Sequence, residues 1–428
     1  MKKRIAITLF LISFGCISIV VINRFFILSA ECIPPDVATI PANMYQAHPK
    51  RETSIFTAAQ LIPFSWSIQP NWLQPFQREM KPAEFPFINA IAVRDEIVWV
   101  GFLSQILRYN NITGVSDLYQ IFDENQEMFV VRDIFFTQDG NLWALVATNK
   151  KSNSVAVARY NPQSNQFDVV PKLFNKEDKG DTFFKSPHIL AETTDGKLLV
   201  PLAHNIVLYD VRQNTILFLL PSDFPRYMYV SGMAVFGNKV WFTVGWFATE
   251  GNRVMDLRSV DLQTGEIINY GHILGMLVDP EWRFSNQESY RSLTIDRYGN
   301  VWVGGSLSQL KLGPDGKYVW QKIAPPPEFV YETVVNPYED ENNFKYAYQW
   351  ADVYSVDHYS DGNIWFDSTV GLVQYNPKKN KWCKSITTGW DNAVFTEDGE
   401  GNLWMAIIQD SHSDNPHLNI YKHKLLIP

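Results

Sequence analysis

The chain has 428 residues, of which 46% are hydrophobic and 19% charged, and its formal net charge is −8. This composition is typical of a globular protein and excludes an intrinsically disordered one. The acidic balance argues against nucleic-acid binding, because phosphate binders normally carry a basic stripe and none follows residue 50. Aromatic residues make up 14% of the chain, which favours sheets, since aromatic rings pack well on pleated surfaces.

The N-terminal region has the layout of an export signal. Basic residues at positions 2–4 precede a stretch without a charge, 5–22. A positive start that stays inside, followed by about 27 Å of apolar helix, is typical of a signal anchor. We expect residues 1–31 to be this anchor, with a single transmembrane helix over about 5–28 and everything after it outside the cytoplasm. Secretion after cleavage is the alternative, but the residues before Glu31 make a poor cleavage site.

The next segment, residues 32–52, is rich in proline and polar residues and is expected to form an extended stalk. The chain contains three cysteines: Cys16 in the apolar run, Cys32 directly after it, and Cys383. In an oxidising compartment Cys32 and Cys383 are the candidates for a disulfide. The alternative is that Cys383 is a small core residue.

Seven copies of one phrase follow, from residue 88 to about 425. Each copy has an apolar run, a tight turn such as QDGN or RYGN, and a second run with a large marker residue. The marker positions are Trp99, Trp143, Leu199, Trp241, Trp302, Trp365 and Trp404. They are about 39 to 63 residues apart, which is the spacing of propeller blades with insertions.

The repeats predict an all-β fold: a seven-bladed β-propeller of four-stranded antiparallel blades over residues 53–428. Glycine or asparagine in most of these turns tolerates the positive φ that a tight hairpin requires. A four-stranded sheet cannot bury both faces alone, so copies must pack face to face around an axis, with the marker tryptophans as structural wedges. The last copy lacks a fourth strand, and we expect residues 54–62 to supply it and close the ring.

The phrases DGNLW at 139–143 and GLVQYN at 371–376 resemble the two-component regulator propeller repeat family. That resemblance implies a β-propeller, and it covers residues 88 to about 425. Family members are often extracellular sensor halves fused to a cytoplasmic histidine kinase. Because the sequence ends at Pro428, we do not expect a kinase, and the name of the repeat does not bring the signalling role with it.

The candidate site lies at the end of the propeller opposite the short turns, where the long connections meet. In six of the seven copies the residue that begins the innermost strand is polar: Asn89, Arg132, His188, Ser231, Arg291 and Tyr354. The position two residues further on is apolar in every copy. Two arginines and a histidine suit a carboxylate, phosphate or sulfate. The alternative is a solvated channel rim.

The largest insertion, 324–351, combines carboxylates with aromatic residues. Its aromatic candidates are Tyr331, Tyr338, Tyr346, Tyr348 and Trp350. Such rings suit stacking on a sugar or contact with a protein partner, and a plain solvated loop is the alternative. We expect no cofactor and no metal site; calcium or magnesium is left as an alternative, but the acids lack the tight ligand spacing that calcium needs.

We therefore expect a membrane-tethered, extracytoplasmic binding, recognition or scaffold module whose partner is a small anion, a glycan or a protein. The runner-up is a lyase or hydrolase. The DG-x-x-W phrases are similar to those of streptogramin-inactivating propeller lyases, which implies chemistry at the channel mouth with histidine and a divalent metal. Arg132, His188 and Arg291 are the candidates for that role. No Gly-x-Ser-x-Gly, His-Glu-x-x-His or phosphate-loop motif is present, and no full catalytic set matches.

Overall fold

The computed structural model describes residues 32–33, 37–41 and 73–79, and residues 88–425 apart from a set of connecting segments. These segments are 103–104, 123–127, 149–154, 171–189, 203–204, 222–228, 248–252, 273–291, 305–307, 324–329, 336–344, 351–352, 369–370, 387–392 and 410–416. Within the described part of the chain, no helix is both long and apolar enough to cross a bilayer. The predicted anchor at 1–31 lies outside it.

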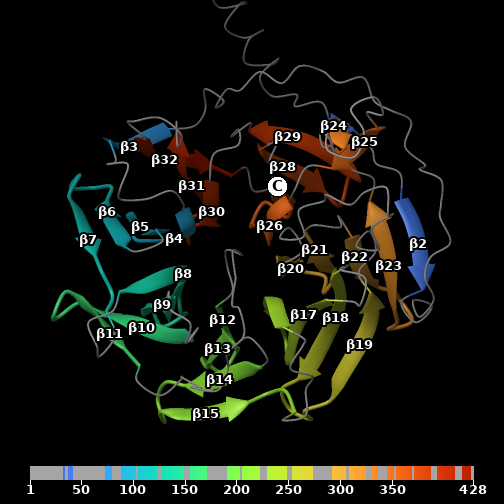
Figure 1. The fold of residues 1–428 in the computed structure, drawn as a ribbon, viewed down its shortest axis with the longest axis horizontal. Coiled ribbons are helices and arrows are strands. Elements are labelled where there is room, and N and C mark those ends of the chain that lie inside the picture. Colours follow the sequence, from blue (N-terminus) through green and yellow to red (C-terminus); the bar gives the residue numbers. More distant parts are fainter. Residues whose placement is uncertain are drawn as a thin grey trace, which may run out of the picture.

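Seven antiparallel sheets, the blades, surround a central axis, as predicted (Figure 1). Blade 1 contains β4 (Ile88–Arg94), β5 (Ile97–Phe102), β6 (Ile106–Asn110) and β7 (Ser116–Tyr119). Blade 2 contains β8 (Phe129–Phe136), β9 (Leu142–Thr148), β10 (Val155–Asn161) and β11 (Gln166–Val169). Blade 3 contains β12 (Ala191–Glu192), β13 (Leu198–Pro201), β14 (Ile206–Asp210) and β15 (Thr215–Phe218). In each blade the first strand lies innermost and the last outermost.

The remaining blades follow the same plan. Blade 4 contains β16 (Tyr229–Phe236), β17 (Lys239–Phe247), β18 (Arg253–Asp261) and β19 (Ile267–His272). Blade 5 contains β20 (Leu293–Ile295), β21 (Val301–Val303), β22 (Ser308–Leu312) and β23 (Tyr318–Ile323). Blade 6 contains β26 (Val353–His358), β27 (Ile364–Ser368), β28 (Gly371–Asn376) and β29 (Lys381–Ile386). Blade 7 takes β30 (Ala393–Glu397), β31 (Asn402–Gln409) and β32 (His417–Lys424) from the C-terminal part of the chain.

An N-terminal strand completes blade 7, but it is not the expected one. β3 (Leu73–Glu79) pairs antiparallel with β32, placing Phe76 opposite Ile420 and Gln77 opposite Asn419. The predicted closing segment, 54–62, lies outside the described residues. β3 thus pairs with the edge of β32 that would otherwise be exposed.

Two parts of the expected stalk pair with the propeller. β1 (Cys32–Ile33) is a fifth strand on the outer edge of blade 6, and β2 (Val37–Pro41) is a fifth strand on blade 5. We call residues 32–41 the N-terminal strap. These two parts of the expected stalk are therefore edge strands of the propeller, because β29 and β23 offer unpaired edges that an extended segment can join.

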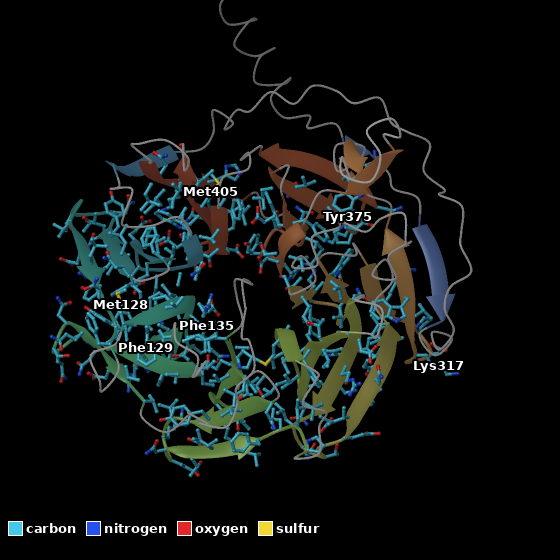
Figure 2. All side chains as sticks on the ribbon, viewed as in Figure 1. Met128, Phe129, Phe135, Lys317, Tyr375 and Met405 are labelled. Carbon is cyan, nitrogen blue, oxygen red and sulfur yellow. The ribbon has the colours of Figure 1, made fainter. Side chains whose placement is uncertain are left out.

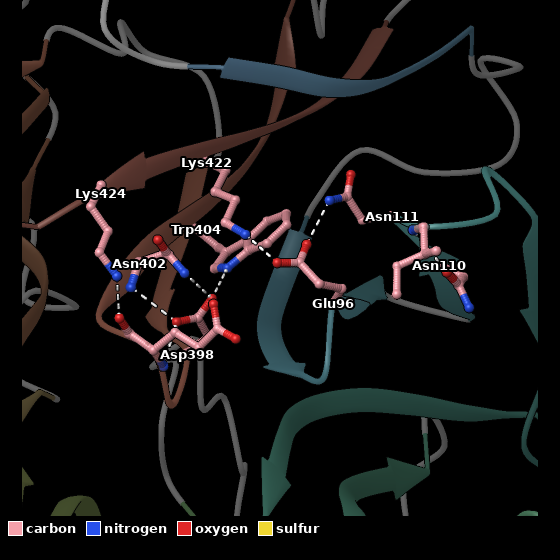
Figure 3. Close-up of polar contacts among 10 residues, drawn as sticks. Glu96, Asn110, Asn111, Asp398, Asn402, Trp404, Lys422 and Lys424 are labelled. Carbon is pink, nitrogen blue, oxygen red and sulfur yellow. Dashed lines mark hydrogen bonds and ion pairs between the residues drawn. The ribbon is translucent and has the colours of Figure 1, made fainter.

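Polar contacts also join blade 7 to blade 1 (Figure 3). Lys422 Nζ, on β32, donates to Glu96 Oε1, in the first turn of blade 1. Asn111 Nδ2 donates to the other oxygen of Glu96 at 2.5 Å. Lys422 also lies 4.8 Å from the ring centre of Trp404, a cation–π distance. One lysine thus contacts both sides of the junction at which the ring closes.

The marker tryptophans lie between blades. Trp99, Trp143, Trp241, Trp302, Trp365 and Trp404 are all buried, the most accessible, Trp365, being only 4% exposed. Several of these rings contact an aromatic residue of the following blade: the ring centre of Trp99 lies 4.7 Å from that of Tyr160, and that of Trp302 lies 5.3 Å from that of Tyr375. Figure 2 shows side chains filling the space within and between neighbouring blades. The wedge position repeats because each blade must bury the same face against the next.

Glycines in the hairpin turns allow backbone angles that other residues resist. Gly140, in the turn before β9, has a φ of +88°, and a Cβ there would lie 2.5 Å from Nη1 of Arg94 in blade 1. Gly316, in the turn before β23, has a φ of +76°, and nothing lies within 4 Å of its Cβ position. Both positions thus require a positive φ, but only at Gly140 would an added Cβ contact another side chain.

We expect Gly140→Ala to lower the free energy of unfolding by about 1–2 kcal/mol, and Gly316→Ala by about 1 kcal/mol, because only the first adds a contact to the backbone strain. Urea denaturation of both variants measures the difference. Equal losses in the two variants would show that the Arg94 side chain moves aside at no cost.

Candidate functional site

The two ends of the propeller differ in their connections. The turns between first and second strands, and in blades 1–6 also those between third and fourth, lie at one end of the propeller, which we call the turn end. Connections from second to third strand and from blade to blade lie at the other, the loop end. The first strand of every blade begins at the loop end. Four of the predicted site residues lie near the start of these strands, which places them towards the loop end: Asn89, Arg132, Ser231 and Tyr354.

Four predicted site residues occupy β-bulges. The pairing of first and second strands shifts by one residue between Ile88 and Ala90, between Val131 and Asp133, between Val230 and Gly232, and between Val353 and Ser355. The residues skipped by these shifts are Asn89, Arg132, Ser231 and Tyr354. We call them the bulge ring. A bulge bends the strand and re-aims the side chain of the extra residue, and bulges are over-represented beside active sites.

The bulge ring occupies one equivalent position in the repeat. Trp99 pairs with Ala92 and Trp143 pairs with Phe135, and each bulge residue lies three positions before that partner. Blade 1 reaches this register although its first turn is shorter than that of blade 2. The same count back from Ala191 and Thr294, the partners of Leu199 and Trp302, gives His188 and Arg291. These two predicted members lie outside the described residues.

Asn89 contacts, across a blade junction, the strand that carries Arg132. Asn89 Nδ2 donates to the carbonyl of Val131 at 2.6 Å, linking blade 1 to the residue just before Arg132. Arg132 itself is half-buried. The amide of Asn89 therefore helps to hold the bulge that carries Arg132, a positioning contact that the sequence pattern did not indicate.

An apolar layer lies two residues further along the seven strands, as the sequence predicted. Its members are Ile91, Ile134, Leu190, Met233, Leu293, Val356 and Phe395. All seven are buried, the most accessible of them 7% exposed. The ring therefore stands above a packed layer, which gives its backbone a rigid support.

Between ring and apolar layer, buried polar side chains bridge neighbouring blades, and sequence reasoning missed them. Asp133 accepts the N–H of Leu190 in blade 3 at 2.7 Å. At the equivalent position of blade 5, Ser292 accepts the N–H of Val356 in blade 6 at 2.8 Å. The signal was present as a polar residue inside an otherwise apolar strand. Buried polar groups are normally satisfied in this way.

Further buried polar residues lie towards the loop end of other strands. They are Thr243, Asp256, Ser355, Asp367 and Asn419. Asp256 Oδ2 accepts hydrogen bonds from Asn269 Nδ2 at 3.2 Å and from Arg258 Nη2 at 3.3 Å. At the turn end, by contrast, buried polar residues such as Asp296 satisfy the N–H groups of their own hairpins. The buried polar residues towards the loop end therefore do not serve to stabilise hairpin turns, unlike those at the turn end.

The insertion between blades 5 and 6 contains a hairpin rather than a plain loop. β24 (Val330–Val335) pairs with β25 (Lys345–Trp350), so that Tyr331 faces Gln349 across the ladder. Tyr346, Tyr348 and Trp350 occupy alternate positions of β25. Tyr338 lies outside the described residues. Four of the five predicted aromatics are thus residues of this hairpin.

His188, the candidate for histidine and metal chemistry, lies outside the described residues. Within the described part of the chain, no three side chains of His, Cys, Asp and Glu lie close enough together to hold an ion. His358 ends β26 at the turn end, away from the bulge ring. Burial lowers the pKa of His358, although Asp296 and Asp361 act in the opposite direction. This histidine therefore favours its neutral form and is no part of the candidate site.

No protein-family model matches the chain, and no curated protein matches it. Several solved structures are similar to the chain. One is the extracellular domain of BT4673, a hybrid two-component system from B. thetaiotaomicron. It is 14% identical with a TM-score of 0.31, and the match covers 77% of this chain and 47% of that chain. The corresponding domain of BT3049 shows 16% identity and a TM-score of 0.29, covering 75% and 49%. This chain therefore spans about half the length of these two.

A chain of the mitotic checkpoint complex is 11% identical, with a TM-score of 0.50 and coverage of 87% of this chain and 99% of that chain. At such identities the likeness concerns the propeller fold and carries no function across.

Proposed function

We propose that this protein is a recognition module that binds a small organic or inorganic anion at the loop end of the propeller. The bulge ring forms the binding site, with Arg132 as the main anion contact. Residues 1–31 tether the module to the membrane and place it outside the cytoplasm. The arginine head group offers planar two-point hydrogen bonding to a carboxylate, phosphate or sulfate.

One observation carries the proposal. Six polar site residues were predicted, and all four of them with a described backbone are bulge residues at the same register position of their blades. Bulges interrupt a ladder, so their recurrence around an axis needs a reason beyond strand pairing. Convergence of polar groups on one point of a rigid scaffold is the usual geometry of a small-molecule site. The buried polar residues gathered at the same end support this placement.

A thermal-shift screen of the full chain against dicarboxylates, phosphate, sulfate and sugar acids tests the proposal. We expect at least one anion to raise the melting temperature of the wild type and to lose most of this effect with Arg132→Ala. Arg132→Lys keeps the charge but loses the planar contact, and should retain only part of the shift. Arg212→Ala is the matched control, because Arg212 is exposed in a turn at the opposite end. Equal shifts in Arg132→Ala and Arg212→Ala would contradict the proposal.

A second candidate function, sugar or protein binding, is favoured by the ordering of the insertion as a hairpin. Three aromatics at alternate positions of one strand suit stacking on sugar rings or anchoring a protein surface. Tyr348→Ala should then weaken binding of an oligosaccharide or partner while leaving the effect of simple anions unchanged. Loss of the anion effect in Tyr348→Ala would instead make the hairpin part of the anion site.

A further inference from the structure

The N-terminal strap brings the second cysteine of the chain opposite the third. β1 pairs antiparallel with β29, the outermost strand that blade 6 contributes itself. In this ladder Cys32 is the direct partner of Cys383, and Ile33 is the direct partner of Trp382. The two cysteines are 351 positions apart in the sequence (383 − 32), so only the fold places them together.

Direct cross-strand partners have the spacing a disulfide needs. In antiparallel ladders such Cα atoms are about 4.5 or 5.5 Å apart, depending on the pair type. Disulfides span Cα separations of about 4.4–6.8 Å. Either pair type therefore meets the requirement without backbone movement. A shift of β1 by one residue would place Ile33, not Cys32, opposite Cys383.

We propose that Cys32 and Cys383 form a disulfide that fastens the N-terminal strap to blade 6. This proposal does not depend on ligand binding. It depends on the proposed extracytoplasmic location only because an oxidant must be available there. The oxidant is a small disulfide or a disulfide-carrying protein that reacts by thiol–disulfide exchange. One protein thiolate attacks its disulfide and releases one thiol; the second protein thiolate then attacks the protein sulfur of the mixed disulfide and releases the other. Two protein thiols become one disulfide, and the reagent is reduced to two thiols.

The bond has two consequences for the fold. It holds a short fifth strand on the edge of β29, which would otherwise expose unpaired backbone groups. It also links the chain covalently across the ring, because the stretch between the two cysteines contains blades 1–5 complete. Blade 7 closes the ring through the β3–β32 ladder; the disulfide closes a covalent loop over residues 32–383 that does not depend on that ladder.

Peptide mapping of the full chain tests the pairing directly. The protein is equilibrated with a mixture of reduced and oxidised glutathione, free thiols are blocked with N-ethylmaleimide, and tryptic peptides are compared before and after reduction. We expect the peptide that contains Cys32 to be linked to the peptide 382–384, and Cys16 to be alkylated without reduction. Alkylation of Cys32 and Cys383 before reduction, or linkage of either to another cysteine, would overturn the proposal. Repeating the mapping on protein taken from its native compartment tests the location separately.

A variant cycle tests what the bond does. Cys32→Ser, Cys383→Ser and the double variant should lower the melting temperature by the same amount, since each removes the same bond. A reductant should lower the melting temperature of the wild type by that amount and leave the three variants unchanged. Cys16→Ser is the control and should behave as the wild type. Additive losses in the double variant would show that the two cysteines act separately.

Discussion

Trp404→Ala should lower the free energy of unfolding by about 3–5 kcal/mol, a large part of the stability of a folded domain. Trp404 is 0% exposed and shares a core cluster with Val98, Leu107 and Tyr109 of blade 1. Its Nε1 donates to Asp398 Oδ2 at 2.8 Å (Figure 3). Truncation therefore leaves a cavity at the junction where the ring closes and removes one donor from a half-buried carboxylate.

Urea denaturation followed by far-ultraviolet circular dichroism measures this loss. Leu217→Ala is the control, because Leu217 lies on the outer strand β15 and is 58% exposed; its effect should stay within about 0.5 kcal/mol. A loss below about 1 kcal/mol for Trp404→Ala would show that blades 7 and 1 are held together mainly by other contacts.

Asp398→Ala should lower the free energy of unfolding by about 2–4 kcal/mol. Asp398 Oδ1 accepts the N–H groups of Glu400 and Asn402, both at 2.9 Å. Its Oδ2 accepts Asn402 Nδ2 at 2.7 Å and Trp404 Nε1 (Figure 3). Alanine leaves these donors without their acceptor, and a buried unsatisfied donor costs about 1–3 kcal/mol. Urea denaturation measures the loss, with Asp315→Ala as the control.

The size of this loss can be compared with the losses at two other aspartates, one equivalent to Asp398 and one exposed. Asp296 accepts the same set of donors in blade 5, including Trp302 Nε1 at 3.1 Å, so Asp296→Ala should match Asp398→Ala. Asp315 is exposed and accepts the N–H of Lys317 at 3.1 Å, so its loss should be small. Equal effects of Asp315→Ala and Asp398→Ala would mean that the repeated carboxylate contributes only as an ordinary turn residue.

The same carboxylate predicts a pH dependence. Burial alone would raise the pKa of Asp398, but the hydrogen bonds from Trp404, Asn402 and Glu400 together lower it below its ordinary value of 3.8. The unfolded state therefore takes up its proton first as the pH falls. The stabilisation is present above the ordinary pKa and is lost as the pH falls through the folded-state value. The difference in melting temperature between the wild type and Asp398→Asn should therefore begin to shrink as the pH falls below about 4 and continue to shrink as it falls through the folded-state pKa.

Much of the fold could be predicted because its signals are local and repeat. The Asp-Gly and Gly-Asn turns, followed at a fixed distance by Trp143, Trp302, Trp365 or Trp404, predict both the hairpins and the buried wedge. Positions counted from these markers also predicted the equivalent residues Asn89, Arg132, Ser231 and Tyr354, since the register of a hairpin is set by its turn.

Long-range pairing could not be predicted in the same way. β3 carries Pro75 and charged residues, so its alternation is weak, and only its ladder with β32 identifies it as the closing strand. The strap contains several prolines, so its sequence resembles that of a linker. Only its pairing with the edge strands of blades 5 and 6 identifies β1 and β2 as strands. Bulges depend on both strands of a ladder, so the sequence could place Arg132 at the loop end but not on a bulge.

Isothermal titration of the anion that stabilises the protein most, against the wild type and Arg132→Ala, tests the central claim most directly. The account predicts one site per chain and at least a tenfold higher Kd for Arg132→Ala, since loss of a charge-assisted contact costs about 1.5–3 kcal/mol. Arg212→Ala should keep the Kd of the wild type. An unchanged Kd in Arg132→Ala, with a folded protein, would contradict a binding site at the bulge ring.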